Sequence, residues 1–242
     1  MIYQKNSNKI YSDFAKYKNF LPTEKAGRHK SHSGLEKNIF RDIIKKLDLK
    51  KGDKFLDIGS GCGPLADFLV KFCNQNNIKI TLCDIPDVIK VLKKKYLNYR
   101  NINYIENEFQ KKNLNQKYNK ILCYSVIQCV NNPRDFLKKI LKILTLNGKA
   151  LIGDIPNLNR KFRFLKSDFG KNFEKKRLKK EIKFNNFKSF LKSTKQNKLI
   201  NDNFIKFVLN YSHKQNRNCF ILKQPKELPF SFTREDILIE EI

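Results

Sequence analysis

The stretch that decides the fold reads KFLDIGSGCGPLADFLV and runs from Lys54 to Val70. An apolar run ends in Asp57, three glycines follow at every second position, and a proline then opens an amphipathic segment. Glycine accepts a positive φ and lets a ligand approach the backbone, and a helix start presents unpaired N–H groups. The stretch therefore predicts a strand over Lys54–Ile58, a ligand-binding turn and a helix over Pro64–Asn74.

The same pattern excludes two common phosphate-binding turns. A dinucleotide-binding turn reads G-x-G-x-x-G, and counted from Gly59 its third glycine falls on Pro64. A P-loop closes with Lys followed by Ser or Thr, whereas Pro64 is followed by Leu65 and Ala66. The turn is thus expected to hold a ligand other than a pyrophosphate, and a tight turn that binds nothing is the alternative.

Strand and helix patterns alternate on both sides of this turn. A helix is expected to begin near Ser33, because Ser33 and Glu36 have the spacing of a capping box. Right-handed crossovers then predict a doubly wound parallel sheet with helices on both faces. The other strands are expected at Ile78–Asp84, Ile102–Glu106, Lys120–Ser125, Ala150–Ile155, Cys219–Leu222 and Ile237–Glu240, with a turn at Asn147-Gly148 before the fifth. The other helices are expected at Pro86–Tyr96, Pro133–Leu144 and Asp202–Tyr211.

Composition indicates one globular domain. A chain of 242 residues that is 40% apolar can fill one core, and no linker rich in Pro, Gly or Ser divides it. The first residues lack the apolar run of a signal peptide and no stretch approaches a membrane span, so we expect a soluble cytoplasmic protein. The six cysteines form no CxxC pair and no Cys/His cluster, which predicts reduced thiols and no metal site.

The formal net charge of +28 is the strongest feature of the composition. Such a surface attracts phosphates, nucleic acid or anionic membranes. However, 42 of the basic residues are Lys and only 9 are Arg, the residue best suited to bind phosphate and read base edges. Codon drift in an A/T-rich genome explains the lysines equally well, so the charge alone selects no partner.

The motif DIGSGCG resembles the first motif of class I S-adenosylmethionine-dependent methyltransferases, an acidic residue followed by GxGxG. The second mark of that family, an acidic residue at the end of the second strand, is matched by Asp84 in ITLCDIP. The resemblance implies a Rossmann-like fold, that is, a doubly wound, mostly parallel seven-stranded sheet with a C-terminal antiparallel strand pair. It also implies S-adenosylmethionine as the cofactor and methyltransferase activity. The cofactor-binding residues that it implies are Asp57, Gly59, Ser60, Gly61, Gly63, Asp84, Ile85, Glu108, Phe109, Ser125 and Gln128.

The resemblance also implies roles for these side chains. Asp84 would accept hydrogen bonds from the ribose hydroxyls, with capping of the next helix as its structural alternative. Glu108, or Glu106 if the register slips, would contact the adenine amino group, and Phe109 would stack on the adenine ring. The segment Tyr118–Val130, which contains Ser125 and Gln128, would form the strand and loop beneath the sulfonium.

Methyl transfer to a hydroxyl needs alignment, exclusion of water and usually a general base. His29 and His32 lie just before the first helix, and Asp154 ends the fifth strand, so these three are the candidate catalytic residues. A solvated histidine or a turn-forming aspartate is the alternative for each. Further candidate acceptor contacts are Tyr11, Tyr17 and Arg28. Residues 1–33 are expected to form an N-terminal lid on a methyltransferase domain over 34–242.

Residues 157–213 are expected to form a helical insertion on the acceptor side. From Arg160 to Lys198 there are 15 basic and 3 acidic residues, interleaved with phenylalanines. Such a segment can bind a single nucleic-acid strand, or it can cover the cleft with its rings inward, which the helical spacing of Phe184, Phe187 and Phe190 favours.

These observations give three hypotheses for function. The first is methyl transfer to a hydroxyl, less readily an amine, of a small anionic acceptor such as a sugar or nucleotide sugar, resembling enzymes of bacterial surface-sugar biosynthesis. The second makes RNA the acceptor and uses the basic insertion as the binding arm. The third is a non-catalytic nucleic-acid-binding module on a methyltransferase-like fold. The sequence does not indicate the oligomeric state.

Overall fold

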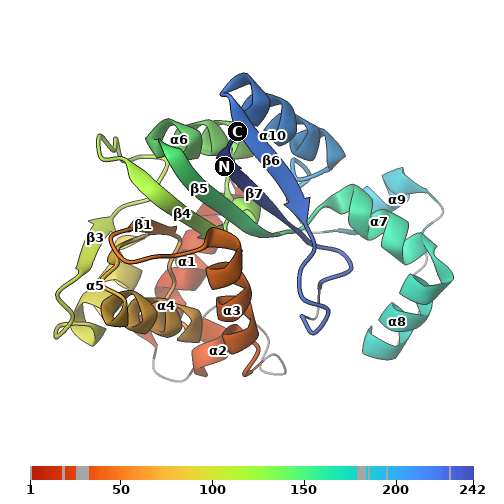
Figure 1. Cartoon of the computed structure of the whole chain (residues 1–242). Coiled ribbons are helices and arrows are strands. Elements are labelled where there is room, and N and C mark those ends of the chain that lie inside the picture. Colours follow the sequence, from red (N-terminus) through yellow and green to blue (C-terminus); the bar gives the residue numbers. More distant parts are fainter. Residues whose placement is uncertain are drawn as a thin grey trace.

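A seven-stranded sheet forms the centre of the molecule, in the order β3-β2-β1-β4-β5-β7-β6 (Figure 1). The computed structural model describes residues 2–17, 20–25, 33–178, 184, 186–194, 196–228 and 230–242. Neighbouring strands are parallel except for the pairs that β7 makes with β5 and β6. The strands are β1 (Lys54–Ile58), β2 (Lys79–Asp84), β3 (Ile102–Glu106), β4 (Tyr118–Tyr124), β5 (Leu144–Ile155), β6 (Arg217–Leu222) and β7 (Glu235–Glu241). The predicted fold class is confirmed.

Helices cover both faces of the sheet, because the parallel strands carry apolar side chains on both sides. On one face α3, α4 and α5 pack on residues such as Phe55 and Leu82. On the other face α6 and α10 pack on residues such as Ile121 and Ile237 (Figure 1). These helices are α3 (Glu36–Leu47), α4 (Pro64–Gln75), α5 (Pro86–Lys95), α6 (Pro133–Ile143) and α10 (Asp202–Lys214).

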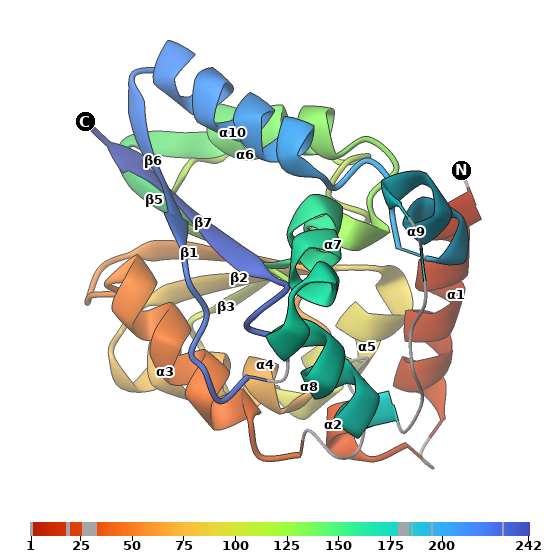
Figure 2. The same cartoon turned by 90° about the vertical axis from the view of Figure 1, so that its right-hand side faces the viewer.

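Of the residues 157–213 expected to form an insertion, those of α10 instead pack on a face of the sheet. The described helices of the insertion itself are α7 (Leu158–Lys166), α8 (Asp168–Leu178) and α9 (Phe187–Ser193). Figure 2 shows these helices in front of the sheet, with α7 and α8 next to the loop between β6 and β7. Asn157 fixes the start of the insertion, since its side chain caps α7 and donates to Glu235 at 2.8 Å. Phe164 of α7 stacks on Phe232 of the β6–β7 loop with ring centroids 5.5 Å apart. The insertion is therefore held to the start of β7 by a hydrogen bond and to the β6–β7 loop by an aromatic contact.

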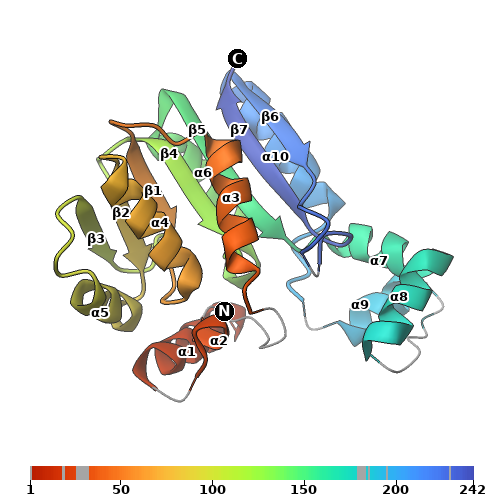
Figure 3. The same cartoon turned by 60° about the horizontal axis from the view of Figure 1, so that its bottom comes forward.

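The N-terminal helix α1 (Ile2–Lys16) lies across one end of the sheet, beside the short α2 (Pro22–Lys25) (Figure 3). It packs against α5 and against η2 (Ile127–Cys129), a single 3₁₀ turn after β4. In the ranges that the structure describes, no helix has the length and apolar character needed to cross a bilayer.

Two local predictions are wrong. Ser33 does not cap the first core helix, because α3 begins at Glu36 after Leu35 and has no side-chain cap. β5 begins at Leu144 rather than Ala150, because Leu144 pairs with Tyr118 of β4 ahead of a shift in register.

Candidate active site

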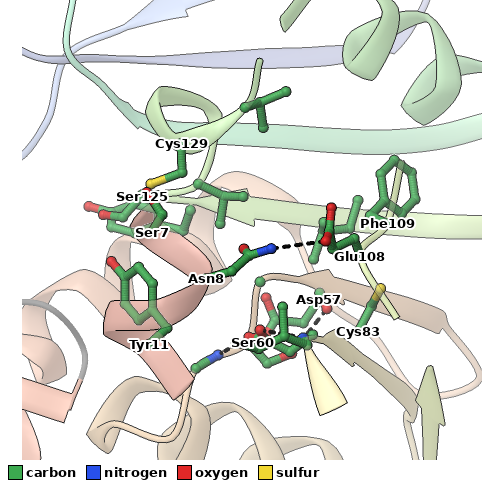
Figure 4. A pocket seen from close by; sticks show the side chains of 18 of the residues that line it. Ser7, Asn8, Tyr11, Asp57, Ser60, Cys83, Glu108, Phe109, Ser125 and Cys129 are labelled. Carbon is green, nitrogen blue, oxygen red and sulfur yellow. Dashed lines mark hydrogen bonds between the residues drawn. The ribbon is translucent and has the colours of Figure 1, made fainter. Parts of the chain in front are cut away.

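A pocket opens at the carboxyl ends of the parallel strands and encloses ≈ 1070 Å³ of empty space, open solvent at its mouth included (Figure 4). This is the edge at which ligands of doubly wound sheets bind. Ten of the eleven residues expected to bind the cofactor line it: Asp57, Gly59, Ser60, Gly61, Gly63, Asp84, Ile85, Glu108, Phe109 and Ser125. Gln128 is not among the described lining residues, and its Nε2 donates to the Ser125 backbone oxygen at 2.6 Å.

The glycine turn after β1 is tight on one side and open on the other. Gly59 has a φ of +72°, and a Cβ built on it would lie 2.3 Å from Cγ2 of Val126. Its N–H donates to the Cys83 backbone oxygen at 2.7 Å, which ties the turn to β2. Gly61 has a φ of +61°, but a Cβ there would meet no atom within 4 Å. The turn is thus packed against the loop after β4 at Gly59 and leaves room for a ligand at Gly61.

Asp84, at the end of β2, joins the glycine turn to the start of α5. The N–H of Gly61 donates to its Oδ2 at 2.8 Å, and the N–H of Ile85 donates to its Oδ1 at 2.7 Å. Ile85, not Asp84, is the N-cap residue of α5, which has no side-chain cap. Burial raises the pKa of Asp84 to about 6, against the lowering effect of these two N–H groups. Each carboxylate oxygen can accept a second hydrogen bond, so this side chain can still receive ligand hydroxyls.

Asp57 is a second buried carboxyl in the same pocket. Burial raises its pKa to about 7, and the negative charge of Asp84 acts in the same direction. The Ser60 hydroxyl donates to the backbone oxygen of Asp57 at 3.0 Å and fixes the turn. Positive charge that enters the pocket would therefore bring both carboxyl groups back toward their ionised form.

An aromatic side chain, Phe109, lines the pocket shortly after the end of β3. Phe109 is buried and packs edge-on against Phe136, with ring centroids 5.1 Å apart. Lys139 of α6 fixes the backbone of this segment, because its Nζ donates to the backbone oxygens of Phe109 and Gln110 at 2.5 and 2.8 Å. Phe109 is thereby fixed in a segment that has no regular secondary structure.

Helix α1 forms one side of the pocket, within the residues 1–33 that the sequence predicted to be a lid. Figure 4 shows Ser7, Asn8 and Tyr11 reaching from α1 toward the glycine turn and the loop after β4. Asn8 Nδ2 donates to Glu108 Oε1 at 2.9 Å. Tyr11 was an expected acceptor contact, whereas Ser7 and Asn8 carry no motif that would single them out.

A second point of attachment holds α1 to the start of α5. Lys16 Nζ lies 2.9 Å from Asp87 Oδ2, and the Ser12 hydroxyl donates to the same carboxylate. The first attachment is to Glu108 itself, and the second is to Asp87, in the first turn of the helix that follows Asp84.

Asp154 lies behind Ser125 rather than in the pocket wall. Both residues have a φ of +59°, and the Ser125 hydroxyl donates to Asp154 Oδ2. Arg234 of the β6–β7 loop donates to the same oxygen at 2.8 Å. Gln224 Nε2 donates to the other oxygen, Oδ1, at 3.4 Å. The Asp154 carboxylate is therefore held by three side-chain donors and positions Ser125, which does line the pocket.

The structure does not place the other candidate catalytic and acceptor residues in the pocket. His29, His32 and Arg28 lie outside the described residues. Tyr17 is 59% exposed and is not among the lining residues. Cys129 lines the pocket beside Ser125, and burial raises the pKa of its thiol. Over the residues with a described placement, no three His, Cys, Asp or Glu side chains gather as metal ligands would.

Comparisons with known proteins agree on the kind of domain. A family model described as a methyltransferase domain matches residues 49–202. The mitochondrial ubiquinone biosynthesis O-methyltransferase of Schizosaccharomyces pombe is 27% identical over 124 residues, which are 49% of this chain and 43% of that protein. Ribosomal RNA small subunit methyltransferase A of Borreliella afzelii is 29% identical over 111 residues, 46% of this chain and 36% of that protein. The chain spans less than half the length of either curated relative.

A solved structure is similar over nearly its whole length. The N-methyltransferase NodS from Bradyrhizobium japonicum, in complex with S-adenosyl-L-homocysteine, matches with a TM-score of 0.62. The match covers 98% of both chains at 9% sequence identity. At that identity the likeness shows the fold.

Proposed function

The chain belongs to the methyltransferase domain family, and from this premise we propose that it transfers a methyl group from S-adenosylmethionine to a hydroxyl of a small anionic acceptor, such as a sugar or nucleotide sugar. The observation that carries the proposal is the hydrogen-bonded junction of Asp84 with the glycine turn, inside a pocket of suitable size. The name of the S. pombe relative supports oxygen as the accepting atom.

The residues of the pocket fit this donor. The Asp84 oxygens would accept the ribose hydroxyls, and the fixed ring of Phe109 would cover the adenine. The open space at Gly61 leaves room for the amino-acid tail to approach the backbone. Once bound, S-adenosylmethionine supplies a methyl–sulfur bond that breaks as the new oxygen–methyl bond forms.

The protein's own part in the reaction is to orient the reactants and to exclude water. Ser125 lies at the end of the pocket nearest β5, and Asp154 and Arg234 hold it in place. Helix α1 covers this region with Ser7 and Tyr11, which limits access of water. His29 and His32 stay our candidates for the base that takes the hydroxyl proton.

The acceptor class is tested by an activity panel. Purified protein and S-adenosylmethionine are incubated with nucleotide sugars, sugar phosphates, the matching neutral sugars and RNA, and formation of S-adenosylhomocysteine is followed. We expect the anionic sugars to react at least about tenfold faster than their neutral counterparts, the effect of one charge-assisted contact. Methylation of RNA with no reaction of any sugar would overturn the proposal.

RNA is the second candidate acceptor, and two observations favour it. One relative is named as a ribosomal RNA methyltransferase. In addition, Lys171, Lys175 and Lys176 are exposed on the short helix α8. An RNA substrate would bind with an affinity that falls steeply as salt rises.

Donor binding is expected to release protons. The pKa of Asp57 is about 7 and that of Asp84 about 6, both above the ordinary value, so each group is partly protonated at pH 5.5 and ionised at pH 8. The donor carries an ammonium group and ribose hydroxyls, which favour the ionised carboxylates. We therefore expect the affinity for S-adenosylhomocysteine to rise about tenfold from pH 5.5 to pH 8.

Calorimetric titrations in two buffers of different ionisation enthalpy would count the released protons. The same raised pKa values mean that the ligand-free protein loses stability as pH rises through this range, because the folded state binds more protons than the unfolded state. Equal affinity at both pH values would contradict the assignment of these two carboxyl groups to the donor site.

A further inference from the structure

Three cationic side chains meet where the insertion packs against the β6–β7 loop. They are Lys161 of α7, Arg177 of α8 and Arg234, which comes just before β7. Both guanidinium groups lie over the ring of Phe230, with Cζ to centroid distances of 5.8 Å for Arg177 and 5.0 Å for Arg234. Lys161 is within electrostatic range of both arginines. The two arginines thus share one aromatic side chain, and Lys161 comes near enough from a third element to interact with both.

The acidic groups of this cluster are already engaged by the arginines. Glu174 accepts from Arg177 Nε at 3.0 Å and from its Nη2 at 2.5 Å. Asp154 accepts from Arg234 at 2.8 Å. Lys161 is half-buried, and within the described ranges no acceptor lies at hydrogen-bond or ion-pair distance from its ammonium group.

Partial burial without a protein acceptor disfavours the charged form of an ammonium group, and a bound anion would stabilise that form. Burial and the two arginines lower the pKa of Lys161, while the charge of Glu174 acts in the opposite direction. The cluster therefore has a positive charge in excess of its carboxylates. Each arginine also keeps donors that its carboxylate does not use, since a guanidinium has five N–H groups.

The cluster adjoins the end of the pocket where we place the methyl group. Arg234 holds Asp154, which accepts from the lining residue Ser125. Arg234 also acts electrostatically on Cys129, another lining residue. Figure 2 shows α7 and α8 in front of this end of the sheet, beside the β6–β7 loop. A group bound by the three cations would therefore lie on the acceptor side of the donor.

We propose that Lys161, Arg177 and Arg234 bind a phosphate group of the acceptor, so that the substrate is a phosphorylated or diphosphate-linked small molecule. The proposal rests on the proposed function, because it identifies the charged part of that acceptor. Three donors that approach from α7, α8 and the β6–β7 loop suit the tetrahedral oxygens of a phosphate. A carboxylate, by contrast, is satisfied in its plane by one bidentate arginine.

The test is a calorimetric titration of the full chain, first with S-adenosylhomocysteine and then, with that ligand bound, with inorganic pyrophosphate. We expect Lys161→Met to weaken pyrophosphate binding about tenfold or more, the effect of losing one charge-assisted contact. Lys161→Arg keeps the charge and should stay within about threefold of the wild type. Lys166→Met removes an exposed charge from the same helix and should change binding by less than about twofold, since an exposed charge is screened.

The outcomes separate this proposal from the proposed function. If S-adenosylhomocysteine does not bind the folded wild-type protein, the proposed function fails. If it binds but pyrophosphate does not, or if Lys161→Met and Lys166→Met have equal effects, the phosphate site is wrong. Succinate that binds as tightly as pyrophosphate would show a general anion site and would overturn the choice of phosphate. If Lys161→Met no longer binds S-adenosylhomocysteine, then loss of pyrophosphate binding by the folded Lys161→Gln variant decides instead.

Discussion

Replacing Asp84 by alanine is expected to weaken the binding of S-adenosylhomocysteine by at least about 100-fold. Two hydrogen bonds to a charged acceptor would be lost, each worth about 1.5–3 kcal/mol. The change also frees the N–H groups of Gly61 and Ile85, which now converge on this carboxylate, so the turn itself would lose its fixed position. Calorimetric titration of the variant and the wild type measures the loss directly.

Two further variants make this result specific. Asp84→Asn keeps the shape of the side chain and one acceptor oxygen. We expect its affinity for S-adenosylhomocysteine to lie between that of the wild type and that of Asp84→Ala. Asp168→Ala removes a carboxylate that is 95% exposed on α8, and it should leave binding unchanged. Binding by a folded Asp84→Ala variant within about threefold of the wild type would refute the role of this residue.

Replacing Gly59 by alanine is expected to destabilise the protein by about 3 kcal/mol. A positive φ costs a non-glycine residue about 1–2 kcal/mol, and the added Cβ would lie 2.3 Å from Cγ2 of Val126. An overpacked contact costs about 1–3 kcal/mol more. For a chain of this size the sum lowers the Tm by roughly 10 °C, which a thermal unfolding experiment detects easily.

The neighbouring glycine provides a matched control. Gly61→Ala meets the same restriction on φ but no atom within 4 Å, so it should lose only about 1–2 kcal/mol of stability. Its added methyl group would lie in the pocket. It should therefore reduce the affinity for the donor more than it reduces the stability of the fold. The double variant Gly59→Ala/Val126→Ala removes the clashing methyl groups and should recover part of the lost Tm. If the two single variants unfold at the same temperature, packing against Val126 is not the reason for Gly59.

Local sequence patterns were sufficient for most of the fold. The apolar run, the alternate glycines and the following proline lie within 17 consecutive residues from Lys54 to Val70, and the structure has β1 over the expected residues. Asp84 could be placed for the same reason, because the end of a strand is visible in its apolar pattern. The two short apolar runs near the C-terminus located the last two strands, which are slightly longer in the structure, and the family resemblance implied that they are an antiparallel pair.

Contacts between distant segments could not be predicted in this way. Asn8 reaches Glu108 across 100 positions of the chain, and no pattern near either residue indicates it. Arg234 donates to Asp154 from the β6–β7 loop, 80 positions along the chain, and no local pattern indicated that this candidate base also accepts from Ser125. The start of β5 depended on a partner in β4, which a local turn signal at Asn147-Gly148 did not reveal.

The position of α1 has a consequence for the timing of catalysis. Its attachments end on Glu108, which would contact the adenine, and on Asp87, which lies close to Asp84, so we expect the spent donor to leave more slowly while the helix stays in place. Ion pairs as exposed as that of Lys16 and Asp87 hold with little free energy and are weakened by salt. The residence time of the product, and with it the turnover rate, would then depend on the ionic strength of the surroundings even though the chemical step does not.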